Sequence, residues 1–131
     1  MIGLDTNVLV RYIMQDDARQ SPLATRLVES LSAESPGFVS LVSVVELAWV
    51  LGSAYGLDRG QLVEALEGLL RTKEIVVDRA ETVWKALRIF QNANADLADC
   101  LIERTAASAG CDKTMTFDRG AAKGCGMVLV S

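Results

Sequence analysis

The chain has 131 residues, a length that suits one domain with a buried core. Half of its residues are hydrophobic and 23% are charged, which excludes a disordered or fibrous chain. No apolar stretch approaches the roughly 20 residues that a membrane-spanning helix requires, and the N-terminus lacks the segments of a signal peptide. We therefore expect a single domain over residues 1–131, located in the cytoplasm and not in a membrane.

The chain contains no histidine. This excludes catalysis by a histidine base, Ser-His-Asp and Cys-His catalysis, and zinc, iron or copper sites with histidine ligands. The three cysteines, Cys100, Cys111 and Cys125, include no C-x-x-C pair, so we expect buried or half-buried thiols and not disulfides or a zinc site. The net charge of −4 is unfavourable to nonspecific nucleic-acid binding, unless divalent cations cancel a local group of acids. Any catalysis must rest on carboxylates, hydroxyls, Lys, Arg or a hard metal ion.

Short β-like runs alternate with longer helical patterns along the chain. In order, we predict a strand at Ile2–Leu4, helices at Thr6–Met14 and Ser21–Ser32, a strand at Phe38–Ser40, a helix at Val42–Tyr55, a helix capped by Asp58 and running through Leu70, a strand at Ile75–Val77, helices at Arg79–Asn92 and Asp96–Ala109, a strand at Lys113–Phe117, a short helix, and a last strand at Met127–Val130. This alternation predicts an α/β fold with a parallel sheet covered on both faces. In such sheets, functional sites gather beyond the carboxyl ends of the strands.

Three acids follow predicted strands. Asp5 closes the first strand, Glu46 lies on the helix that follows the second strand, and Asp118 ends the fourth. Each acid alone also fits a helix-capping role: Asp5 and Asp118 as N-cap residues, and Glu46 in a capping box with Ser43. Taken together, acids at the ends of parallel strands would crowd one edge of the sheet.

Two further acids, Asp96 and Asp99, begin the predicted helix Asp96–Ala109 and share an acidic face with Glu103. For Asp96 a capping role is favoured, whereas Asp99 borders the apolar stripe and is better placed to face a cleft. Carboxylates gathered in one place must protonate, repel one another or hold cations. Oxygen ligands without histidine or thiolate select Mg²⁺ or Mn²⁺.

Four segments form a pattern in order and spacing: LDTNVLVRY at 4–12, SVVEL at 43–47, DLADCLI at 96–102 and TFDR at 116–119. Together they resemble the PIN-domain family over essentially the whole chain and, within it, the VapC-type toxin ribonucleases of type II toxin–antitoxin systems. The resemblance implies a three-layer α/β/α sandwich with a four- to five-stranded parallel sheet. It also implies a homodimer and a cognate antitoxin protein that blocks the site.

The resemblance assigns roles to particular residues. The metal-binding and catalytic acids would be Asp5, Glu46, Asp99 and Asp118, with Asp96 as a further metal ligand. Polar residues that support this site would be Thr6, Asn7 and Thr116. Arg11 and Arg119 flank the site segments, so they are either contacts for RNA phosphates or solvated surface arginines.

The sequence thus predicts an endoribonuclease that uses Mg²⁺ or Mn²⁺ and acts as the toxin of a toxin–antitoxin pair. One alternative is a phosphatase of the HAD type with Asp5 as nucleophile, although that class has a second acid where this chain has Asn7. A receiver domain needs an acidic pair after the first strand, where Asp5 stands alone. A third alternative is a PIN-like binding module without catalysis.

Overall fold

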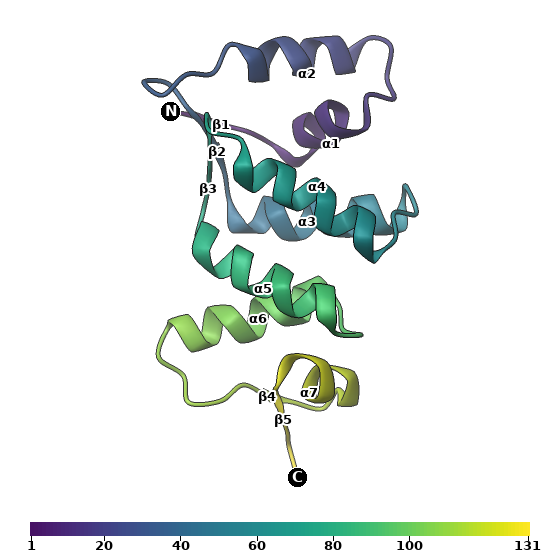
Figure 1. Cartoon of the computed structure of the whole chain (residues 1–131), viewed down its shortest axis with the longest axis vertical. Helices are drawn as coiled ribbons and strands as arrows, with labels where there is room; N and C mark the ends of the chain where they lie inside the picture. The colour runs from purple at the N-terminus through teal and green to yellow at the C-terminus, as the bar shows by residue number, and fades with distance from the viewer. The chain divides into compact units, whose positions relative to one another are not determined.

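The computed structural model describes residues 1–131 and places them in two compact units, Met1–Asp78 and Arg79–Ser131. Each unit combines helices with short parallel strands, which are labelled in Figure 1. The α/β class is therefore confirmed, while the single domain over residues 1–131 stays a prediction. No helix has both the length and the apolar character needed to cross a membrane.

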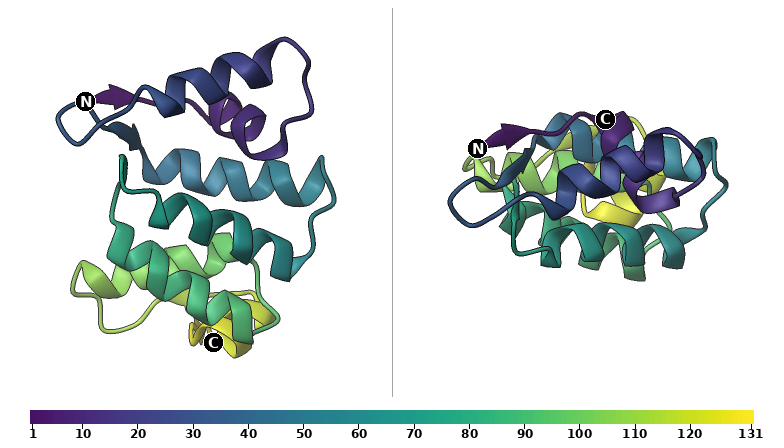
Figure 2. Two further views of the ribbon diagram at one scale, coloured as in Figure 1. Left: turned by 45° about the horizontal axis from the view of Figure 1, so that its top comes forward. Right: turned by 90° about the horizontal axis from the view of Figure 1, so that it is seen from above.

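The first unit contains a three-stranded parallel sheet in the order β1-β2-β3. Its elements are β1 (Ile2–Gly3), α1 (Thr6–Met14), α2 (Gln20–Glu29), β2 (Gly37–Val39), α3 (Leu41–Ser53), α4 (Arg59–Arg71) and β3 (Ile75–Val77). Ile2 pairs with Gly37, and Phe38 pairs with Val76. Because β1 and β2 are adjacent and parallel, the chain leaves both strands at the same edge of the sheet and enters α1 and α3 there (Figure 2).

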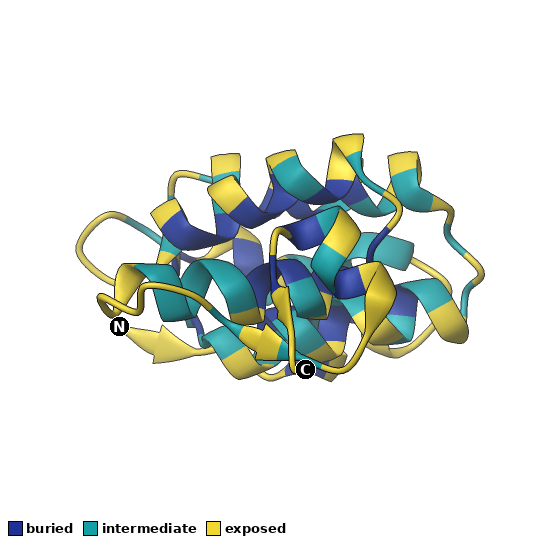
Figure 3. Ribbon diagram, turned by 90° about the horizontal axis from the view of Figure 1, so that it is seen from below, coloured by how far each residue is buried: buried dark blue, intermediate teal, exposed yellow.

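Apolar residues at helical spacing hold this unit together. Val44, Leu47 and Leu51 on α3 are almost completely buried, and so is Leu9 on α1. Along the helices, buried residues alternate with exposed ones, as expected for helices that pack against a core with one side (Figure 3). A Cβ at Gly37, at the start of β2, would lie 2.8 Å from the Leu4 side chain, so a larger residue there would force its buried neighbours to shift.

The second unit contains a helical core and a two-stranded parallel sheet. Its elements are α5 (Ala80–Asn92), α6 (Leu97–Ser108), β4 (Met115–Thr116), α7 (Arg119–Cys125) and β5 (Val128–Leu129). Helix α5 packs against α6, and α7 contacts both. Cys100 and Cys125 are buried and reduced, with their sulfur atoms 3.4 Å apart. Cys111 is exposed, which corrects the expectation that all three thiols would be at least half-buried.

All five strands have parallel partners, as the sequence predicts. The predicted strand Lys113–Phe117 forms only the two-residue β4, and Met127–Val130 forms only the two-residue β5. Both strands are largely exposed, so few apolar contacts favour a longer ladder. A continuous sheet of four to five strands, and the three-layer sandwich built on it, remain predictions.

Candidate metal centre

A pocket of about 570 Å³ lies beside α1 and α3 in the first unit. The residues that line it are Asp5, Thr6, Asn7, Val10, Arg11, Glu46, Val50, Ala54 and Tyr55. Its acids follow β1 and β2, the strands whose carboxyl ends share one edge of the sheet. The sequence-based expectation that Asp5 and Glu46 lie together is therefore met within this unit.

Asp5 is the N-cap residue of α1. Its backbone is extended, and its Oδ1 accepts a hydrogen bond from the Thr6 N–H at 2.7 Å. The capping role considered from the sequence is thus present. The second carboxylate oxygen accepts no hydrogen bond from the protein, and the residue is exposed, so Asp5 can also bind a ligand.

Glu46 is not part of a capping box, which corrects one of the alternatives drawn from the sequence. The N-cap of α3 is Ser40, whose Oγ accepts a hydrogen bond from the Ser43 N–H at 3.1 Å. Since α3 begins at Leu41, Glu46 lies in the second turn, beyond the reach of a cap. It is exposed and makes no ion pair or side-chain hydrogen bond. Its carboxylate has no structural task in this unit.

Thr6 is the unusual member of the pocket. It is only 6% exposed, and its hydroxyl is buried without a hydrogen-bond partner. A buried hydroxyl without a partner costs free energy, so Thr6 is placed here at some cost to the stability of the fold. Asn7, which is exposed, adds an amide to the lining.

The donor set of the pocket fits a hard divalent cation. Carboxylate, hydroxyl and amide oxygens are the ligands that Mg²⁺ and Mn²⁺ prefer, and Mg²⁺ is commonly held by only one or two carboxylates while it keeps several waters. Neither unit gathers three or more acidic or thiol side chains in a ready-made cage. Within the first unit, a cation would therefore be held by Asp5 and Glu46, with water completing its shell.

Arg11 lines the same pocket but is not a free surface arginine. Its Nη1 donates to Asp16 Oδ1 at 3.2 Å and to the Tyr55 hydroxyl at 3.2 Å, and its Nε donates to Gln20 Oε1 at 2.9 Å. The Tyr55 hydroxyl donates in turn to Asp16 Oδ2 at 2.7 Å. This bond, together with the guanidinium, holds the pKa of the Asp16 carboxyl below its usual range. A contact of Arg11 with RNA phosphate stays a prediction.

The second unit holds the other acids at the starts of two helices. Asp96 is the N-cap residue of α6, the position favoured for it from the sequence. Its side chain makes no capping hydrogen bond. Asp99, in the first turn, is half-buried. Burial raises its pKa above the usual value, and the charges of Asp96 and Asp118 raise it further. Asp96 and Asp118 therefore both lie near enough to Asp99 to disfavour its charged form.

Asp118 is the N-cap residue of α7, and its Oδ1 accepts a hydrogen bond from the Ala121 N–H at 3.1 Å. Its own N–H donates to the Thr116 hydroxyl at 2.9 Å, so Thr116 helps to fix the turn that carries the acid. Gly124 on α7 lies against the turn before α6, where an added Cβ would be 2.8 Å from that of Ala95. Arg119 is exposed and makes no ion pair.

The predicted site residues are thus grouped within each unit. Asp5 and Glu46 line one pocket of the first unit, while in the second unit Asp96 and Asp118 both act on Asp99. That residues from both groups hold the same ion remains a prediction. Sequence reasoning missed the pocket residues Val50, Ala54 and Tyr55. The spacing of Val50 and Ala54 from Glu46 (i+4 and i+8) places them on the same helix face and was a usable signal.

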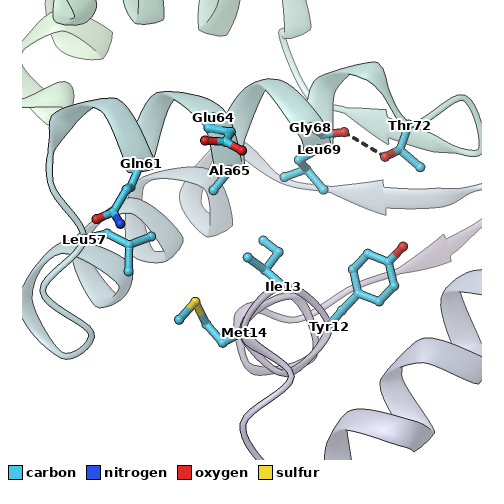
Figure 4. Close-up of a pocket in the computed structure, with 10 residues that line it drawn as sticks. All are labelled: Tyr12, Ile13, Met14, Leu57, Gln61, Glu64, Ala65, Gly68, Leu69 and Thr72. Atoms are coloured by element: carbon cyan, nitrogen blue, oxygen red, sulfur yellow. Dashed lines mark hydrogen bonds between the residues drawn. The ribbon is translucent and has the colours of Figure 1, made fainter.

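A second pocket of the first unit, of about 520 Å³, has a different character. In Figure 4, Tyr12, Ile13 and Met14 of α1 lie across from residues of α4 such as Ala65 and Leu69. Only one charged residue, Glu64, lines this pocket. Without a group of acids it has no means of holding a metal ion, so the candidate metal centre is the pocket beside α1 and α3.

Two comparisons relate this chain to known proteins. The sequence profile of the PIN domain matches residues 2–126. A VapC ribonuclease from Aquifex aeolicus (strain VF5) is 22% identical over 116 residues, which cover 88% of this chain and 86% of that protein. Because the profile extends over nearly all of the sequence, this chain belongs to the PIN-domain family.

Proposed function

We propose that this protein is a metal-dependent endoribonuclease that hydrolyses RNA phosphodiester bonds as the toxin of a toxin–antitoxin pair. Family membership and the similarity to a VapC ribonuclease support a nuclease that cuts RNA. The observation that carries the proposal is the first-unit pocket. There, Asp5 and Glu46 have no ion-pair partner and lie in the same lining as the unpartnered hydroxyl of Thr6.

The proposed metal ligands are Asp5, Glu46, Asp99 and Asp118, with Asp96 as a further ligand. When bound, Mg²⁺ or Mn²⁺ lowers the pKa of a water molecule and offsets charge on the phosphate oxygens. The proposed proton acceptor is Asp99 or Asp118. Attack by water, and not by a ribose 2′-hydroxyl, leaves a 5′-phosphate on the product.

The remaining parts of the proposal concern partners and assembly. The protein acts in the cytoplasm as a homodimer with the three-layer PIN architecture, and an antitoxin protein blocks its acidic site. The net charge of −4 and the unpaired acids suit a basic segment of such an antitoxin. Arg11 and Arg119 are the proposed phosphate contacts.

The test is cleavage of labelled single-stranded RNA by the purified protein in Mg²⁺ or Mn²⁺, with EDTA as the metal-free control. We expect cleavage with 5′-phosphate ends, strongly reduced in Asp5→Ala, Glu46→Ala and Asp99→Ala. Matched controls remove acids outside the site: Glu29→Gln in the first unit and Asp112→Asn in the second, both at exposed positions. If the three site variants cleave like the controls, the proposal is wrong.

Two further results would point to the alternatives. A phosphoryl group trapped on Asp5 after incubation with a phosphate ester would indicate a HAD-type phosphatase. Absence of cleavage in every metal, together with a small basic protein that co-purifies, would indicate a binding module.

A further inference from the structure

Arg11 has an unexpected ion-pair partner. A flexible cation that lines the same pocket as two carboxylates can turn toward them, because opposite charges attract in a partly shielded site. Arg11, Asp5 and Glu46 line the same pocket of about 570 Å³. Nevertheless the guanidinium pairs with Asp16, and neither Asp5 nor Glu46 makes an ion pair.

Three contacts fix the guanidinium away from the acids. Asp16 accepts from Arg11 Nη1, the Tyr55 hydroxyl bonds to both Asp16 and Arg11, and Gln20 accepts from Arg11 Nε. Their positions explain the direction of the side chain, since Asp16 lies in the turn after α1 and Tyr55 follows α3. Asp16 follows the C-terminal end of α1, whereas Asp5 precedes its N-terminal end. Along the helix axis Asp5 lies roughly 9 Å from Arg11, at about 1.5 Å per residue.

We propose that Asp16 is a positioning residue that holds Arg11 away from Asp5 and Glu46 and thereby keeps these two carboxylates available to a divalent cation. The inference rests on the proposed function, in which Asp5 and Glu46 bind Mg²⁺ or Mn²⁺. Tyr55 supports it, because its hydroxyl links Asp16 to Arg11.

The physical reason is competition. An arginine released from Asp16 keeps its charge at every relevant pH and has a long, flexible stem, so it can turn toward the nearest unpaired carboxylates. A guanidinium that pairs with Asp5 or Glu46 occupies oxygens that the metal ion needs and reduces the negative potential that attracts it. The ion pair with Asp16 removes this competitor without removing the positive charge from the pocket.

The experiment measures Mn²⁺ affinity by titration calorimetry for the wild type, Asp16→Asn, Arg11→Gln and the double variant, all as full-length protein without RNA. Asp16→Asn is expected to weaken Mn²⁺ binding roughly threefold to fivefold, which corresponds to the upper part of the range for a partly exposed ion pair. In the Arg11→Gln background, the same substitution should change the affinity by less than about twofold. Glu67→Gln, which removes the exposed pair with Arg71 on α4, is the matched control and should leave the affinity unchanged.

The cycle separates positioning from simple loss of charge. If Asp16 acted only through its negative charge, its removal would weaken Mn²⁺ binding equally with and without Arg11, and that result would overturn the inference. A failure of the proposed function looks different: the wild type would not bind Mn²⁺, or Asp5→Asn and Glu46→Gln would bind it as tightly as the wild type.

A second variant keeps both charges. Tyr55→Phe removes the hydroxyl that bonds to Asp16 and Arg11 but leaves the net charge unchanged. The inference predicts weaker Mn²⁺ binding by about twofold, the scale of one neutral hydrogen bond, whereas an effect of charge alone predicts none. This variant also decides the question if Asp16→Asn does not fold, which thermal unfolding of each variant will show.

Discussion

The two units hold their candidate site acids in physically different ways. In the first unit, Asp5 and Glu46 are exposed, and Asp5 stabilises α1 by capping it. In the second unit, Asp99 is half-buried and near two other acids, which raises its pKa. One unit therefore holds its carboxylates at little cost to folding, whereas the other holds one carboxylate where its charged form is less favourable than in water.

This difference indicates which observation favours a functional role for an acid beyond that of a helix cap. Asp5 and Asp118 have a structural task as caps, so position at a helix start does not by itself indicate catalysis. Asp99 has no such bond and is unfavourably placed when ionised. A carboxylate that costs stability and gives nothing to the fold is the stronger indication of function.

The largest effect expected from this comparison is on activity. Glu46→Gln in the first unit and Asp99→Asn in the second should each lower kcat/KM for RNA cleavage in Mn²⁺ by about a hundredfold to a thousandfold, the range found when one charge-stabilising group is removed from an active site. Steady-state cleavage of a labelled oligonucleotide measures it. Loss of activity in only one of the two variants would restrict the active site to one unit.

Combining the two substitutions sharpens the comparison. If Glu46 and Asp99 serve the same ion, the double variant Glu46→Gln/Asp99→Asn should be no more than about tenfold less active than the weaker single variant, because effects within one catalytic unit are not additive. Full multiplication of the two losses in kcat/KM would indicate that the acids work independently. Asp112→Asn combined with Glu46→Gln provides the reference for an unrelated acid.

A smaller effect concerns the cap of α1. Asp5→Ala should lower the free energy of unfolding by about 1 kcal/mol, since alanine cannot accept the hydrogen bond from the Thr6 N–H. Asp5→Asn should retain most of the stability, because asparagine is also a good N-cap residue. Urea unfolding at neutral pH measures both, and equal stability of the three proteins would show that the cap contributes nothing.

The smallest expected effect is an increase in the free energy of unfolding, caused by a substitution at Asp99. Because the pKa of Asp99 is raised in the fold, the folded chain holds this proton more tightly than the unfolded chain does. Its contribution to stability is greatest below the ordinary aspartate pKa of about 3.9 and is lost as the pH rises through the raised value. Asp99→Asn should therefore give a small gain in the free energy of unfolding at neutral pH that disappears in acid. A loss at neutral pH would contradict the raised pKa.

Local sequence rules predicted most of the fold. The predicted helix Thr6–Met14 and strand Ile75–Val77 match α1 and β3 residue for residue, because a capping acid and a buried apolar run mark their limits. The parallel pairing of the strands also followed from their alternation with helices. The strands of the second unit were predicted too long, since β-like composition does not reveal how few contacts an exposed strand will make.

The candidate site could be predicted where its residues follow strands in the sequence. Strand ends pointed to Asp5 and Glu46, and the structure places both in one pocket. The contacts between Arg11, Asp16 and Tyr55 were not predictable, because the bond from Arg11 to Tyr55 joins residues 44 positions apart. The capping box of Ser43 and Glu46, one of the alternatives drawn from the sequence, does not form, because Ser40 caps α3 three residues earlier.

The contact between Gly124 and Ala95 has a consequence for the electrostatics of the second unit. Asp96 directly follows Ala95, and Asp118 begins the helix to which Gly124 belongs. The absence of a single methyl group therefore sets how closely two negatively charged helix starts approach. The size of an uncharged side chain at position 124 therefore affects the repulsion between these carboxylates. A Gly124→Ala substitution would change the electrostatic potential at Asp99 without changing any charge.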